Sequence, residues 1–66
     1  MTFRHDGYHS DGSMCVYGYD KNGVKVAIFK GYPNLRSDTV TLYPRACLAP
    51  TEENIGKQTV SLRILK

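Results

Sequence analysis

Two runs of apolar and β-branched residues, interrupted by polar ones, flank Asn22 and Gly23 in the first half of the chain. An Asn-Gly pair between such runs is the strongest short-range signal for a β-hairpin with a two-residue turn. Pairing the two arms across this turn places opposite each other Asp20 and Lys25, Tyr19 and Val26, Gly18 and Ala27, Tyr17 and Ile28, and Val16 and Phe29. One opposite-charge pair and several aromatic or β-branched pairs favour this register.

Both faces of the predicted hairpin carry apolar groups. The first face has the three aromatic or thiol side chains of one arm and the aliphatic ones of the other: Cys15, Tyr17, Tyr19, Val24, Val26 and Ile28. The second face has the remaining apolar residues of both arms: Met14, Val16, Gly18, Ala27 and Phe29. Such a hairpin is either covered on both sides or leaves an aromatic surface open to a partner.

Two later runs alternate with period two and predict further strands. Thr39–Tyr43 follows a turn cluster over Gly31–Asn34, and we expect Pro44 to end its pairing because proline has no donor for the ladder. Thr59–Lys66 is the predicted closing strand. Its alternation sets three aliphatic side chains on one face: Val60, Leu62 and Ile64.

Residues 45–49 and 50–56 are the candidate helical segments. Pro44 at a first helical position favours one turn over 45–49, with a strand that resumes beyond a bulge as the alternative. Acidic residues near the start of 50–56 and Gly56 at its end favour a second turn. The predicted fold is mostly β: a small antiparallel barrel or sandwich of four to five strands, with a central Asn-Gly hairpin and one or two short helical turns.

A chain of 66 residues predicts a single small domain without a deep enclosed active site, because so short a chain buries little surface. Residues 1–12 are polar and glycine-containing. They predict a flexible or loop-like leader, with an edge strand over Thr2–Arg4 as the alternative. The longest apolar run is Val26–Phe29, too short for a signal peptide or a membrane span, so we expect a soluble cytoplasmic protein with no membrane partner.

Several side chains could in principle ligate a metal ion or act in catalysis: His5, Asp6, His9, Asp11, Cys15 and Cys47. Their spacing is not that of a zinc site, and the loop after Asp6 lacks the ligand pattern of a calcium loop. Cys15 and Cys47 stand among apolar neighbours, which favours inert thiols over a nucleophile. We expect them to stay reduced rather than to form a single disulfide, because an intracellular compartment is reducing. We therefore expect neither an enzyme nor a cofactor.

Binding is the function class that remains. Tyrosines and apolar groups on both hairpin faces, together with exposed strand edges, suit a small protein that blocks or modulates a larger partner, most simply a protein, as small inhibitors and regulators of phages and mobile elements do. The candidate contacts are aromatic residues with flanking arginines: Tyr17, Tyr19, Phe29, Tyr32, Arg36, Tyr43 and Arg45. A homodimer that covers the second apolar face is a further possibility.

The alternative is a module that binds single-stranded nucleic acid or RNA. Aromatic side chains for stacking and cations for phosphates are the groups that such modules use. In this interpretation the tyrosines are joined by four cationic contacts: Lys25, Lys30, Arg36 and Arg45.

Overall fold

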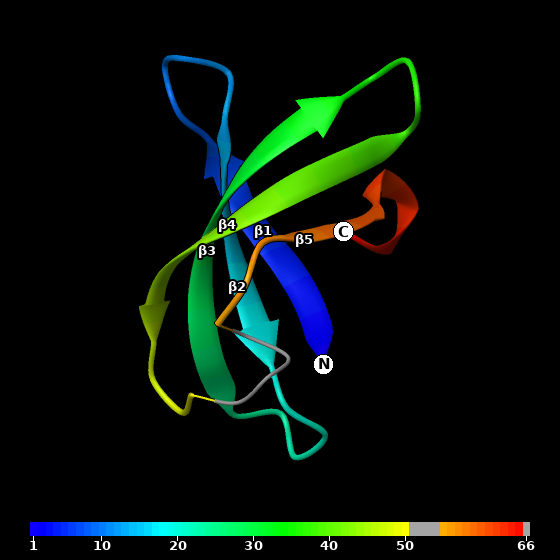
Figure 1. The fold of residues 1–66 in the computed structure, drawn as a ribbon. Coiled ribbons are helices and arrows are strands. Elements are labelled where there is room, and N and C mark those ends of the chain that lie inside the picture. The colour runs from blue at the N-terminus through cyan, green and yellow to red at the C-terminus, as the bar shows by residue number, and fades with distance from the viewer. Residues whose placement is uncertain (51–54, 66) are drawn as a thin grey trace.

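The structure is a computed structural model that describes residues 1–50 and 55–65. Its five strands form one antiparallel sheet in the order of the chain, which curls into a half-barrel (Figure 1). The strands are β1 (Thr2–Tyr8), β2 (Met14–Tyr19), β3 (Lys25–Asn34), β4 (Thr39–Cys47) and β5 (Gln58–Ser61). A 3-10 helix, η1 (Leu62–Ile64), follows β5. The expectation of a mostly β, antiparallel fold with four to five strands is confirmed. The short helical turn η1 lies within the predicted closing strand and not in a predicted helical segment.

The hairpin of β2 and β3 has the predicted register over most of its length. Val16 pairs with Phe29, Tyr17 with Ile28 and Gly18 with Ala27, but a shift then places Tyr19 opposite Lys25. The predicted pairs of Tyr19 with Val26 and of Asp20 with Lys25 are wrong, because the turn is wider than the predicted two residues.

Residues Asp20 to Gly23 form this wider turn. The Gly23 N–H donates to the Asp20 carbonyl at 3.0 Å, and Gly23 is the only residue of the turn with a positive φ, 79°. A type I turn followed by a left-handed glycine gives a three-residue loop, whereas a two-residue type I′ turn requires a positive φ at Asn22 as well. The Asp20 carboxylate accepts from the N–H groups of Asn22 at 2.8 Å and Val24 at 2.9 Å. These bonds stabilise the wider loop.

β3 and β4 form a longer hairpin than the sequence predicted (Figure 1). The predicted turn cluster Gly31–Asn34 is the end of β3, paired with Thr39–Leu42, and the turn itself covers 35–38. Pro44 does not end β4. It lies opposite Phe29, next to a register shift that leaves Arg45 as the extra residue of a bulge, a position where a strand tolerates proline.

The strand therefore resumes beyond a bulge, as the alternative prediction had it. The helical turn predicted over 45–49 is wrong. Four residues of the other predicted turn, 50–56, lie outside the described residues.

The inner face of the half-barrel holds the core. Alternate residues of four strands, together with one residue after η1, are buried there: Phe3, Met14, Val16, Ala27, Phe29, Val40, Leu42 and Leu65. Gly31 gives the sheet room to curl over these groups. A Cβ on Gly31 would lie 3.0 to 3.1 Å from side-chain carbons of Met14, Val16 and Val40.

The edges of the sheet are β1 and β5. β1 corresponds to the edge strand that was predicted as an alternative over Thr2–Arg4. It extends past Arg4 to Tyr8, with an irregularity before Tyr8. β5 is shorter than predicted because the Ser61 side chain caps η1, accepting from the Arg63 N–H at 3.3 Å. Ile64 consequently leaves the face that it was predicted to share with Val60 and is exposed. No helix in the described ranges is long and apolar enough to cross a membrane.

Candidate binding face

The side of the half-barrel opposite the core carries aromatic and cationic side chains. Strand alternation points Tyr17 and Tyr19 of β2 away from the buried Met14 and Val16, and the register aligns with them the alternate residues of the neighbouring strands. We call this surface the outer face and define it by eight residues: Arg4, Tyr17, Tyr19, Lys25, Lys30, Tyr32, Tyr43 and Arg45.

Cations lie over the tyrosine rings of the outer face. The Lys25 Nζ is 4.1 Å from the centroid of the Tyr17 ring, and the Lys30 Nζ is 5.5 Å from that of Tyr32. Each such contact contributes about 0.5–1 kcal/mol at an exposed site. These contacts favour the observed positions of the Tyr17 and Tyr32 rings.

A shallow open depression of about 420 Å³ lies over β3 and β4, lined by Lys30, Tyr32, Tyr43 and Arg45. The rings of Tyr32 and Tyr43 meet edge to face, with centroids 5.5 Å apart and an interplanar angle of 82°. Both remain accessible, at 44% and 45% exposure. The bulge brings Arg45 to its rim. We call this site the Tyr32–Tyr43 depression.

The β1–β2 loop brings a carboxylate to the same rim. Asp11 Oδ2 lies 3.4 Å from the Lys30 Nζ, while Asp11 Oδ1 accepts from the Ser13 hydroxyl at 2.6 Å and the Ser13 N–H at 2.9 Å. The two Ser13 bonds, and secondarily Lys30, hold the pKa of Asp11 well below its ordinary value. Hydrogen bonds with Tyr32 and then Asp11 raise the pKa of Lys30. The rim thus carries one fixed ion pair at neutral pH.

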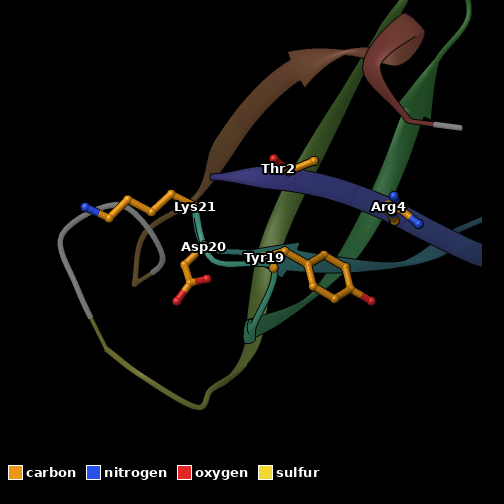
Figure 2. A pocket seen from close by; sticks show the side chains of 6 residues that line it. Thr2, Arg4, Tyr19, Asp20 and Lys21 are labelled. Carbon is orange, nitrogen blue, oxygen red and sulfur yellow. The ribbon is translucent and has the colours of Figure 1, made fainter.

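A second depression, of about 410 Å³, lies where β1 meets the β2–β3 turn. It is lined by Thr2, Arg4, Tyr19, Asp20, Lys21 and Gly23. Figure 2 shows Arg4 and Tyr19 on neighbouring strands here, with the Lys21 side chain directed away from them. The Asp20 carboxylate is already engaged by two turn amides, so this depression offers a partner fewer groups than the first.

Seven of the predicted contact residues lie together on the outer face: Tyr17, Tyr19, Lys25, Lys30, Tyr32, Tyr43 and Arg45. Phe29 does not. Its side chain is 0% exposed and packs edge to face on Phe3, so its proposed role in binding is wrong, because strand alternation turns it into the core. Arg36 lies apart, in the exposed 35–38 turn, where its N–H donates to the Asn34 side chain.

Arg4 and Asp11 were missed as parts of this surface. Strand alternation over Thr2–Arg4 was the available signal for Arg4, which pairs with Tyr17. The ion pair of Asp11 with Lys30 depends on the path of the β1–β2 loop, for which the sequence has no signal.

The residues once considered for metal binding do not converge. Within 1–50 and 55–65, no three His, Cys, Asp or Glu side chains are grouped as a metal site would require. Cys15 lies in β2 and Cys47 at the end of β4, and no disulfide joins them. A hydrogen bond with Cys15 raises the pKa of Tyr17 above its ordinary value.

Comparison of the chain with protein-family models, with curated proteins and with solved structures finds no match.

Proposed function

We propose that this chain is a small non-catalytic cytoplasmic protein that blocks or modulates a larger partner, a protein, through its outer face. The observation that carries the proposal is the arrangement of four half-buried or exposed tyrosines among four cations on the side of the sheet that the core does not use. Tyrosine and arginine are the side chains most enriched among residues that dominate protein interfaces.

The sheet edges are less suited to binding than the outer face. A partner that adds a strand needs a regular run of unpaired N–H and C=O groups. β1 is interrupted before Tyr8, where Gly7 has a φ of 131°, and β5 has only four residues before η1 begins. These features favour a partner that covers side chains of the face over one that extends the sheet.

The second candidate is binding of single-stranded nucleic acid or RNA. It is favoured by the alternation of Lys25 and Lys30 with tyrosines on one face and by the net charge of +3. Two observations oppose it. Ammonium groups already lie over the rings of Tyr17 and Tyr32, and the carboxylates of Asp6 and Asp11 interrupt the positive charge.

Site-specific photo-crosslinking tests the proposal. A photoreactive residue at Tyr43, in the outer face, is compared in the source cells with one at Leu35, which is exposed on the 35–38 turn. We expect Tyr43 to form a discrete protein adduct that excess unlabelled protein suppresses, and Leu35 to form none. Adducts of equal yield from both positions, or none from either, would contradict an interface on the outer face.

Fluorescence anisotropy with labelled single- and double-stranded DNA and RNA separates the two candidates. Binding through phosphates weakens steeply between about 50 and 200 mM salt. We expect no specific binding at the lower salt. Micromolar or tighter binding with that salt dependence would replace the protein partner by a nucleic acid.

A further inference from the structure

We propose that the Tyr32–Tyr43 depression is an anchor site for an apolar side chain carried by an acidic segment of the partner protein. This inference rests on the proposed function, and it names the chemistry that the partner offers. The depression differs from the rest of the outer face in having two accessible rings side by side with a cation on either flank.

The two rings supply the apolar part of the site. Tyr32 and Tyr43 are each a little less than half exposed, and their edge-to-face packing fixes them before any partner arrives. Rigid aromatic side chains contribute contact area with little further loss of conformational entropy. A depression of about 420 Å³ accommodates one large side chain, such as that of phenylalanine or leucine, but not a folded element.

The two cations beside the rings favour a partner segment with acidic residues on either side of that apolar side chain. Lys30 lies on β3 and Arg45 on the β4 bulge, and both line the depression. The structure also shows a carboxylate bound at this rim, because Asp11 lies 3.4 Å from the Lys30 Nζ. An ammonium group has three donors and a guanidinium has five, so both cations retain donors for carboxylates of a partner.

The same observations disfavour a nucleic acid strand as the occupant. A base would stack on a ring face, but the Lys30 ammonium lies over Tyr32, and Tyr32 meets Tyr43 at an edge.

Peptide titrations followed by NMR of the ¹⁵N-labelled full chain test the inference. The probe is an acidic peptide, Ac-GDEDFDEDG-NH2. Its controls replace the acidic residues by Asn and Gln, or the phenylalanine by alanine. We expect saturable shifts of the Lys30, Tyr32, Tyr43 and Arg45 amides with the acidic probe, and affinity about tenfold weaker for the alanine control and about threefold or more weaker for the neutral one.

Arg45→Gln and its matched control Arg36→Gln locate the binding. We expect Arg45→Gln to weaken the acidic probe about threefold and Arg36→Gln to leave the affinity unchanged, because Arg36 lies in the turn outside the outer face. Equal affinity for the acidic and neutral peptides, or equal effects of the two substitutions, would overturn the inference.

Two outcomes separate this inference from the proposed function. If the acidic peptide causes no amide shifts but Tyr43 still forms its protein crosslink, the anchor site is overturned and the proposed protein interface is not. Displacement of the acidic peptide by a ten-residue oligothymidine at equal concentration would overturn both, because the face would then bind phosphates in preference to carboxylates.

Discussion

At the scale of single residues, Asp11 links a loop to the candidate site. Its carboxylate accepts two hydrogen bonds from Ser13 and faces Lys30, and these contacts stabilise its charged form. The pKa of Asp11 in the folded state therefore lies below the ordinary value of 3.8. Its contribution to stability is present above pH 3.8 and is lost as the pH falls through the lower folded-state pKa.

We predict that an NMR titration of the Asp11 side chain has its midpoint below pH 3.8. Ser13→Ala removes the hydroxyl bond, which is the largest cause of the lowered pKa, and should therefore raise that midpoint more than Lys30→Gln does. A midpoint at or above 3.8 in the unmodified protein would show that the Ser13 and Lys30 contacts do not persist in solution.

Gly31 is the second position where one residue decides a larger property. Gly31→Ala would place a Cβ against three buried side chains that have little room to move, those of Met14, Val16 and Val40. Overpacking of this kind costs about 1–3 kcal/mol, and we expect urea unfolding to register a loss of that size. Gly56→Ala is the control: nothing lies within 4 Å of its Cβ position, so the free energy of unfolding should fall by less than about 0.5 kcal/mol.

At the scale of elements, the β2–β3 turn distinguishes two geometries that the Asn-Gly pair allows. In the observed turn only Gly23 has a positive φ, so only Gly23 needs to be glycine. We predict that Gly23→Ala lowers the free energy of unfolding by about 1–2 kcal/mol and that Asn22→Ala changes it by less than about 0.5 kcal/mol. Chemical denaturation measures both. Comparable losses from the two substitutions would indicate the two-residue turn instead.

Sequence reasoning was most successful where a pattern acts within one element. The period-two alternation correctly separated Val16 from Tyr17, and the arms of the hairpin paired as expected up to Gly18. It failed where a distant partner decides the structure. Gly31–Asn34 has turn-forming residues, but its pairing with Thr39–Leu42 keeps it extended, and a sequence window contains no information on that pairing.

The candidate site was predictable to a similar degree. Strand alternation alone assigns Tyr17, Tyr19 and Lys30 to one face of the sheet. Lys25 joins that face only through the register shift that places it opposite Tyr19, which the predicted pairing lacked. Phe29 was predicted as a binding residue because it is aromatic. Strand alternation already placed it on the same face as Val16, which is the core face. The role of Arg45 at the depression depends on a bulge beside Pro44, which the sequence offered only as one of two alternatives.

At the scale of the whole molecule, the two faces of the sheet separate stability from recognition. The core lies on the inner face, whereas the two cation–ring contacts and the Tyr32–Tyr43 ring contact lie on the outer face. Substitutions such as Arg45→Gln should therefore alter binding while leaving the fold intact, which is what makes the tests of the interface interpretable.

Closure of the half-barrel is the whole-molecule property most open to test. Its edge strands β1 and β5 are not neighbours in the sheet, and the core is completed near the C-terminal end of the chain by Leu65, which is 7% exposed. Burying a leucine side chain and filling its space together account for about 2–5 kcal/mol, so we predict a loss in that range for Leu65→Ala in urea unfolding.

The adjacent Ile64→Ala is the matched control, because Ile64 is 51% exposed and lies outside the core cluster. We expect it to cost well under half as much as Leu65→Ala. Since η1 also docks through the Leu62 N–H on the Asp38 carbonyl, loss of the Leu65 anchor should loosen the 35–38 turn as well, seen as faster amide exchange at Leu62. Equal costs for the two alanine variants, with unchanged exchange at Leu62, would mean that the five paired strands hold the fold without this closure.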